Sequence, residues 1–113
     1  MILPGLELMQ KSLESNTAQL PLAVRNESSN GFGLSTNNAI IGGCDAAQLG
    51  AIQYAIQLAK EVNHPVEKVW IDGGNAKILA AEMGKSKTQS SLSIEATEGL
   101  VLRGVWAWLL QNL

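Results

Sequence analysis

The chain has 113 residues, of which 46% are hydrophobic and 16% charged, a composition that fits one globular domain or part of a larger one. Its formal net charge is -2 and its basic residues are not clustered, which argues against the phosphate-binding surface of a nucleic-acid-binding protein. No stretch approaches the roughly 20 apolar residues that a membrane-spanning helix needs, so neither nucleic acid nor a membrane is expected as a partner.

The chain carries one cysteine, Cys44, which cannot form an intramolecular disulfide. Pro4, Gly5 and Glu7 interrupt the apolar start of the chain, so no signal peptide is expected. Both features favour a cytoplasmic protein, because the cytoplasm keeps thiols reduced.

Apolar residues recur at helical spacing over residues 6–13 and predict a short first helix. Pro4 is expected in its first turn, where a helix tolerates proline. Residues 16–34 have the composition of a connecting segment, with a run of turn-forming residues at 26–31.

A long helix is predicted next. Ser35 or Thr36 offers a hydroxyl group to cap it, and it should run from residue 37 to about residue 62, with Pro65 marking its end.

The early half of this long helix is unusually rich in small residues. They form two rows with a spacing of four, Ala39, Gly43, Ala47 and Ala51 in one and Gly42, Ala46 and Gly50 in the other. Since glycine costs about 1 kcal/mol relative to alanine inside a helix, the glycines call for a reason. Small residues let another backbone approach closely, either a strand beneath the helix or a helix from a second subunit.

The following segments alternate between strand and helix patterns. Residues 66–71 are apolar and β-branched and predict a buried strand, residues 72–75 a tight turn, and residues 76–83 a helix ended by Gly84. Residues 91–94 predict a second, weaker strand.

Residues 100–113 carry apolar side chains at helical spacing and predict a closing helix. Trp106 and Trp108 cannot share one face of it, so Trp106 is expected to pack inward and Trp108 to lie at an edge or in a subunit contact. The order helix, helix, strand, helix, strand, helix indicates an α/β protein. Two short strands make a small sheet, which suggests that further strands precede Met1.

Few residues suggest catalytic chemistry, and no catalytic or metal-binding residue is expected in this chain. His64 is the only histidine and is expected at the surface of a helix end. Cys44 is expected to be buried and inert. Residues 31–33, Gly-Phe-Gly, lack the third glycine and the preceding strand of a nucleotide-binding loop, so they predict a plain loop.

The turn at residues 72–75, Asp-Gly-Gly-Asn, joins the first predicted strand to a helix. Such junctions lie at the carboxyl edge of a sheet, where α/β proteins usually bind their ligands. Two interpretations stay open, a turn that faces a ligand and a turn that only reverses the chain.

Taken together, these segments resemble the C-terminal half of the type III pantothenate kinases, a family that includes the proteins named Bvg accessory factors. Residues 2–5 (Ile-Leu-Pro-Gly) resemble the end of the family's glycine-isoleucine-x-proline-glycine loop, and residues 17–21 (Thr-Ala-Gln-Leu-Pro) its threonine-alanine-x-leucine-proline segment. Residues 35–43 resemble the start of its long helix. Residues 69–76 are similar to its strand and double-glycine turn, although the family more often has threonine in place of Asp72.

A further match lies near the C-terminus, where residues 100–104 (Leu-Val-Leu-Arg-Gly) resemble the family's entry to its last helix. The resemblance therefore runs in the right order from one end of the sequence to the other. Residues 1–113 would then be the C-terminal, substrate-side part of an actin-like ATPase (ASKHA, ribonuclease H-like) fold, rich in helices and with a small partial sheet.

The resemblance also implies ligands and partners. These are pantothenate, ATP with a divalent metal and a monovalent cation whose main sites lie outside this chain, and a second copy in a homodimer. A threonine at the position of Thr36 contacts pantothenate in that family, and the double-glycine turn, here Gly73 and Gly74, lies toward the adenosine side of the nucleotide.

The family's phosphate loop and catalytic base would precede Met1, and phosphoryl transfer depends on such groups for positioning and charge stabilisation. The expected function is therefore the C-terminal portion of a kinase that transfers the γ-phosphate of ATP to pantothenate in coenzyme A biosynthesis, inactive alone. The alternative is a non-enzymatic transcriptional regulator, similar to the Bvg accessory factors, that acts through protein partners. A third possibility is an orphan fragment of a truncated reading frame.

Overall fold

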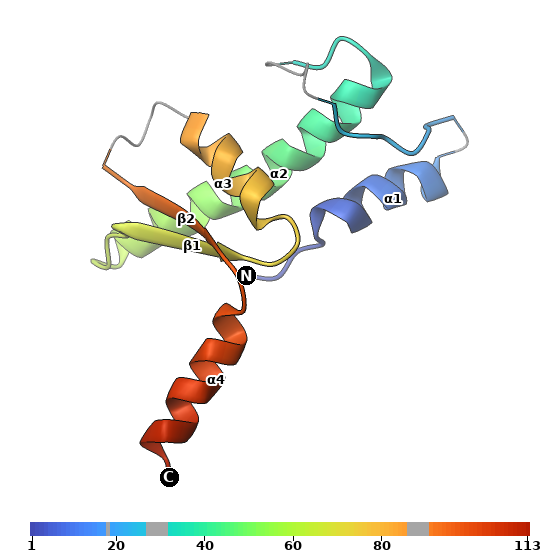
Figure 1. The fold of residues 1–113 in the computed structure, drawn as a ribbon. Coiled ribbons are helices and arrows are strands. Elements are labelled where there is room, and N and C mark those ends of the chain that lie inside the picture. The colour runs from blue at the N-terminus through green and yellow to red at the C-terminus, as the bar shows by residue number, and fades with distance from the viewer. Residues whose placement is uncertain (18, 27–31, 86–90) are drawn as a thin grey trace. The chain divides into compact units, whose positions relative to one another are not determined.

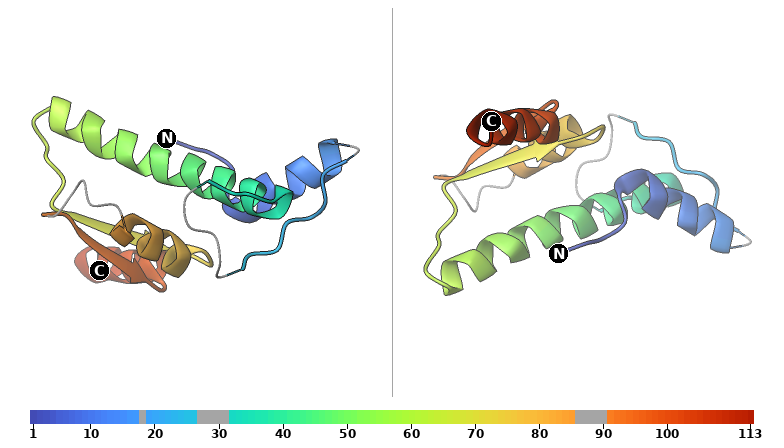
Figure 2. Two further views of the ribbon diagram at one scale, coloured as in Figure 1. Left: turned by 90° about the horizontal axis from the view of Figure 1, so that it is seen from above. Right: turned by 90° about the horizontal axis from the view of Figure 1, so that it is seen from below.

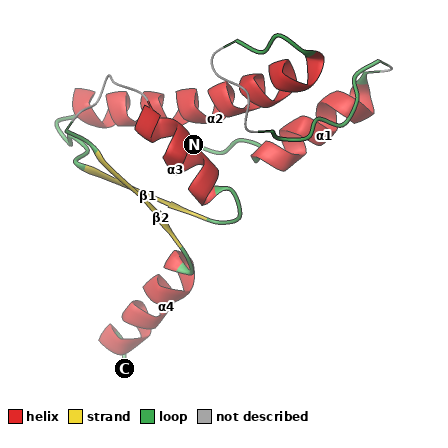
Figure 3. Cartoon of the chain, turned by 45° about the horizontal axis from the view of Figure 1, so that its top comes forward, coloured by secondary structure: helices red, strands yellow, loops and turns green. Residues whose placement is uncertain are grey.

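The computed structural model describes residues 1–17, 19–26, 32–85 and 91–113. The elements follow one another as α1 (Leu6–Asn16), α2 (Thr36–Glu61), β1 (Lys68–Asp72), α3 (Ala76–Lys85), β2 (Ser93–Thr97) and α4 (Leu100–Gln111) (Figure 1). Helices dominate, and both strands belong to the same small sheet (Figure 3). The predicted α/β class and the predicted order of elements are confirmed.

The chain divides into two compact units, Met1–His64 and Pro65–Leu113, here called the first and the second unit. No helix among the described residues is both long enough and apolar enough to cross a membrane.

In the first unit, α1 packs against α2 (Figure 2). Leu6 at the start of α1 is buried, as are Ile40, Ile41 and Cys44 on α2, and Ala23 from the intervening segment joins them. The expected position of Pro4 is wrong, because α1 begins at Leu6 and Pro4 lies before it. The Pro4 carbonyl instead accepts a hydrogen bond from the Gln48 side chain of α2, which ties the start of the chain to the second helix.

The segment between α1 and α2 is also tied to α2. The Asn37 side chain accepts a hydrogen bond from the backbone N–H of Val24 and donates one to its carbonyl, both at 2.8 Å. Farther along α2, the guanidinium of Arg25 contacts both carboxylate oxygens of Asp45, with Nη1 at 2.8 Å from Oδ2 and Nη2 at 2.5 Å from Oδ1. The predicted turn cluster at 26–31 lies mostly outside the described residues.

The start of α2 decides between the two predicted caps. Ser35 has extended backbone angles, and its Oγ accepts a hydrogen bond from the backbone N–H of Asn38 at 3.2 Å. Thr36 is the first helical residue, and its hydroxyl has no hydrogen-bond partner among the described residues. Ser35 is therefore the cap, which leaves the Thr36 hydroxyl available to a ligand.

We expect Ser35→Ala to lower the free energy of unfolding by about 1 kcal/mol, because the first turn of α2 loses its side-chain acceptor. Thr36→Ala is the matched control and should leave stability nearly unchanged. Urea unfolding followed by circular dichroism measures both. An equal loss in the two variants would contradict the assignment of Ser35 as the sole cap.

The second unit is built on a parallel pair of strands, in which β1 pairs with β2 from Lys68 opposite Ser93 to Asp72 opposite Thr97. Helix α3 connects the strands and packs on them, with Ala76, Leu79 and Met83 buried.

Three boundaries in this unit differ from the predictions. The first strand is Lys68–Asp72 rather than 66–71. The second is Ser93–Thr97 rather than 91–94, because pairing with β1 carries the three residues after Ile94 into the sheet. Helix α3 passes through Gly84 to Lys85, whose ammonium contacts Glu82 at 2.6 Å. A single glycine near a helix end costs about 1 kcal/mol and is not enough to stop it.

The closing helix is confirmed as α4, but the expected inward packing of Trp106 is wrong. Trp106 is 64% exposed and Trp108 60% exposed. The reason is that α4 leaves the end of β2 without extensive contact with any other described element of its unit.

Candidate functional site

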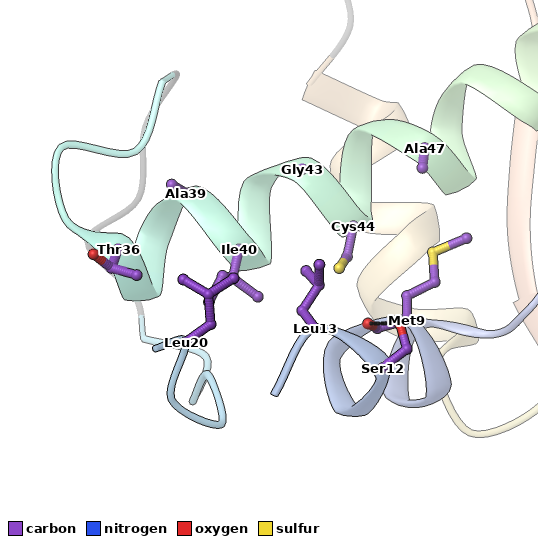
Figure 4. A pocket seen from close by; sticks show the side chains of 10 residues that line it. All are labelled: Met9, Ser12, Leu13, Leu20, Thr36, Ala39, Ile40, Gly43, Cys44 and Ala47. Atoms are coloured by element: carbon purple, nitrogen blue, oxygen red, sulfur yellow. Dashed lines mark hydrogen bonds between the residues drawn. The ribbon is translucent and has the colours of Figure 1, made fainter. Parts of the chain in front are cut away.

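A pocket of about 570 Å³ lies in the first unit between α1 and the N-terminal half of α2. Met9 and Leu13 of α1 face Ile40 and Cys44 of α2 across it, and Thr36 lies at one end (Figure 4). Helix α1 forms the wall opposite α2. The buried side chain of Leu6 and the hydrogen bond from Gln48 to the Pro4 carbonyl hold α1 against α2.

The chemistry of the pocket is that of a binding site rather than a catalytic one. Its walls are mainly aliphatic, and hydroxyl groups come from Thr36 and Ser12. Ser12 donates its proton to the Met9 carbonyl at 2.8 Å, so the Thr36 hydroxyl is the one that can both donate to and accept from a ligand. The lining side chains in the described part of the chain include no carboxylate, imidazole or amine. The pocket can therefore hold a small polar molecule with an apolar branch, but it offers no general base.

Cys44 lines the same pocket and is 5% exposed. Burial raises the pKa of its thiol, and the neighbouring charge of Asp45 raises it further, while Arg25 acts in the opposite direction. The thiol is thus protonated at neutral pH and is a poor nucleophile. The prediction that Cys44 is buried is confirmed. That it is inert stays a prediction.

The small-residue rows of α2 lie beside this pocket and beside a second one. The second pocket, of about 500 Å³, is lined by Gly42, Gly43 and Ala46 together with Phe32 and Gly33. A Cβ atom added at Gly42, Gly43 or Gly50 would have no atom of the first unit within 4 Å. The described residues of the first unit therefore leave this face of α2 open, and the close neighbour that the glycines suggest is not found among them.

The second candidate site is the turn after β1, at the carboxyl edge of the sheet, where Gly73 and Gly74 follow Asp72. Gly73 has a φ of 109°, a left-handed conformation that favours glycine. A Cβ added at either glycine would meet nothing within 4 Å, so the turn presents bare backbone. Its expected position at a sheet edge is confirmed, and its contact with a ligand stays a prediction.

Sequence reasoning missed the role of Asp72 in this turn. Its Oδ2 accepts a hydrogen bond from the backbone N–H of Leu100 at 2.9 Å, at the start of α4. On the neighbouring strand, the Thr97 hydroxyl donates to the Ile71 carbonyl at 3.4 Å. The residue before α4 is Gly99, which has no side chain to cap the helix. No local pattern could reveal this cap, because it comes from a residue 28 positions earlier.

No group of three or more histidine, cysteine, aspartate or glutamate side chains gathers into a metal-binding arrangement within the described ranges. His64 is exposed at the end of α2, and its backbone N–H donates to the Ala59 carbonyl. Phe32 and Gly33 form part of a loop that lines the second pocket, while Gly31 lies outside the described residues.

Comparison with known proteins decides the family. Residues 1–58, which include α1, the pocket and most of α2, match the family model described as type III pantothenate kinase. The chain belongs to the type III pantothenate kinase family. The resemblance found in the sequence is thereby confirmed.

Individual relatives extend the match to both units. The chain is 39% identical to the type III pantothenate kinase of Herminiimonas arsenicoxydans over 108 residues, which cover 93% of this chain and 39% of the relative. It is 37% identical to that of Janthinobacterium sp. (strain Marseille), covering 99% of this chain and 41% of the relative. For Aromatoleum aromaticum the identity is 34%, with coverages of 92% and 38%. The chain thus spans about two-fifths of the length of these type III pantothenate kinases.

Proposed function

We propose that this chain is the pantothenate-side portion of a kinase that transfers the γ-phosphate of ATP to pantothenate, within an actin-like ATPase fold. The observation that carries the proposal is the position of Thr36. It matches the threonine that contacts pantothenate in the family, and here its hydroxyl lies without a described partner at the end of a mainly aliphatic pocket. Such a pocket suits a ligand that has both an apolar branch and hydroxyl or amide groups.

In the second unit, we propose that the turn at Gly73 and Gly74 contacts the adenosine part of ATP. Its bare backbone at the end of a parallel strand leaves room for a flat ring to approach closely, as such strand ends do in other α/β proteins. The described residues form no metal-binding cluster, so we place the divalent metal and the monovalent cation in the part of the relatives that this chain does not span. The single cysteine and the metabolic family support a cytoplasmic protein.

The proposal assigns catalysis to residues outside the pocket. None of the described lining groups can take a proton from the pantothenate hydroxyl, and phosphoryl transfer needs such a group together with a phosphate cradle. We therefore expect this chain to bind substrate in a complete enzyme and to show no ATP-dependent phosphorylation of pantothenate alone.

The test replaces the corresponding two-fifths of the Herminiimonas arsenicoxydans kinase with this chain. We expect the chimera to phosphorylate pantothenate, and Thr36→Ala to raise the Michaelis constant for pantothenate several-fold while that for ATP stays nearly constant. The reason is that a lost hydroxyl contact weakens binding by roughly 0.5–1.5 kcal/mol. Thr36→Ser is the matched control, since it keeps the hydroxyl.

Three results would contradict the proposal. Turnover by the purified 113-residue chain above a blank without enzyme would show that catalysis does not depend on other residues. Equal Michaelis constants in wild type and Thr36→Ala would remove Thr36 from the site. An inactive chimera whose pocket binds no pantothenate would favour a regulatory protein of the accessory-factor kind.

We also propose that a second copy of the chain packs on the small-residue face of α2, as the family implies a dimer. In the first unit a Cβ atom added at position 43 would meet no described atom within 4 Å. Because Gly43 also lines the first pocket, the effect of Gly43→Leu on a partner is measured by sedimentation rather than by activity. We expect overpacking to weaken dimerisation of the chimera by about 1–3 kcal/mol in sedimentation equilibrium. Ser15→Leu, on the exposed end of α1, is the control. Unchanged sedimentation of Gly43→Leu would show that this face is not an interface.

A further inference from the structure

Part of the segment between α1 and α2, residues 19–26 and here called the strap, forms one side of the first pocket. Leu20 of the strap lines the pocket together with Ile40 of α2, and Figure 4 shows both toward the end where Thr36 lies. Residues 19–26 form no helix or strand, so no regular backbone pairing holds Leu20 in place. The position of this wall therefore depends on the contacts that the strap makes with α2.

Neutral hydrogen bonds tie the strap to the first turn of α2. The Asn37 side chain exchanges two hydrogen bonds with the backbone of Val24, at 2.8 Å each. The Asn26 side chain donates to the Asn38 side chain at 3.1 Å, and Ala23 is buried. The hydrogen bonds are exposed to water, which competes for them, so each one holds the strap only weakly.

The ion pair between Arg25 and Asp45 is a stronger tie. The guanidinium contacts both carboxylate oxygens, at 2.8 and 2.5 Å, and a two-point contact of this kind fixes orientation as well as distance. It joins the strap to α2 about two turns beyond Asn37. Asp45 directly follows Cys44, which lines the pocket. The ion pair therefore anchors the strap to the opposite wall of the pocket.

Stability alone does not require a charged pair at this place. Apolar residues of similar volume often replace a buried ion pair with no loss of stability. They differ from it in direction, because hydrophobic contacts do not fix an orientation. A role that depends on the exact placement of the strap would explain the use of Arg25 and Asp45.

We propose that Arg25 and Asp45 are positioning residues for the ligand of the first pocket. Their ion pair holds the strap so that Leu20 packs on the apolar branch of a molecule whose polar group contacts Thr36. This inference rests on the proposed function, in which the molecule is pantothenate and the branch is its pair of geminal methyl groups. Leu20 contacts the ligand, and the ion pair acts through Leu20.

The test uses the chimera with the Herminiimonas arsenicoxydans kinase and compares pantothenate with an analogue that lacks both geminal methyl groups. The readout is the ratio of kcat/KM for the two compounds, which does not change when part of the enzyme is unfolded. We expect Leu20→Ala to lower the preference for pantothenate by about tenfold, since one methylene group in a hydrophobic pocket changes selectivity by roughly that factor or more. Leu22→Ala is the matched control, because Leu22 belongs to the strap, is 50% exposed and does not line the pocket. It should keep the preference.

The double variant Arg25→Met with Asp45→Leu tests the ion pair. It removes both charges and keeps most of the volume, so its stability is expected to stay near that of the wild type. The preference for pantothenate should nevertheless fall by about threefold or more, a coupling typical of residues that act through one another. A role in stability alone would leave this ratio unchanged.

The outcomes separate the inference from the proposed function. A double variant as selective as the wild type would overturn the positioning role, and an unchanged preference in Leu20→Ala would overturn the contact with the branch. In both cases a raised Michaelis constant for pantothenate in Thr36→Ala would leave the proposed function standing. If the chimera is inactive, dissociation constants from calorimetry replace kcat/KM, and a chimera that binds neither compound would overturn both.

Discussion

Asp45→Ala is expected to lower the free energy of unfolding of the first unit by about 3 kcal/mol, near the lower end of the cost of breaking a buried ion pair. Asp45 is 8% exposed and holds Arg25 through two short contacts. Removing the carboxylate takes away the two charge-assisted hydrogen bonds that it accepts from the partly buried guanidinium. The Arg25 side chain retains 31% exposure, which lets water reduce the cost. Urea unfolding of the chain measures the loss.

A double substitution distinguishes the ion pair from general packing. Replacing both partners, Arg25→Met with Asp45→Leu, removes both charges and keeps most of the volume, so we expect it to recover most of the stability lost in Asp45→Ala. A double variant as unstable as Asp45→Ala would mean that the charges are not the cause. Glu7→Ala is the surface control, because the contact of Glu7 with Lys11 joins two exposed side chains and contributes little.

Ile41→Ala is expected to lower the free energy of unfolding by about 2–5 kcal/mol, since the removed methyl groups lose their burial and leave a cavity. Ile41 is 2% exposed and is the largest fully buried side chain among the described residues. The measurement is again urea unfolding, followed at the helical circular dichroism band.

Two further variants serve as controls for Ile41→Ala, one a milder change at the same site and one a change at an exposed site. Ile41→Val removes one methylene group and should cost about 0.5–1.5 kcal/mol. Leu8→Ala, at a site that is 61% exposed, should change stability by less than about 0.5 kcal/mol. If Ile41→Ala were as mild as Leu8→Ala, the packing of α2 into the core of the first unit would be wrong.

The sequence predicted the elements of this chain well because each one carries a local signal. The long apolar and small-residue pattern up to Pro65 predicted α2 almost to the residue, and the β-branched run before Gly73 predicted β1. The limits of β2 and α3 were less accurate. The extent of β2 depends on pairing with β1, and the passage of α3 through Gly84 depends on packing, and neither is encoded locally.

The candidate site was predicted in part. The resemblance to the family singled out Thr36, and the structure places it in a pocket, where its hydroxyl has no hydrogen-bond partner among the described residues. The opposite wall, formed by Met9 and Leu13, could not be predicted, because it depends on the packing of α1 against α2. The inward packing expected for Trp106 failed for a related reason. An apolar pattern indicates that a side chain should be covered, but it does not identify the polypeptide that covers it.

The hydrogen bond from Leu100 to Asp72 joins the double-glycine turn to the first turn of α4. A change in the position of the Asp72 carboxylate would therefore alter the hydrogen bond of the first turn of α4. If a ligand reshapes the turn and another surface binds the helix, the two binding events share a free energy of coupling, and each changes the affinity of the other by the same factor. The threonine that the family more often has here is uncharged and shorter, so the strength of this coupling would be a property in which individual members of the family differ.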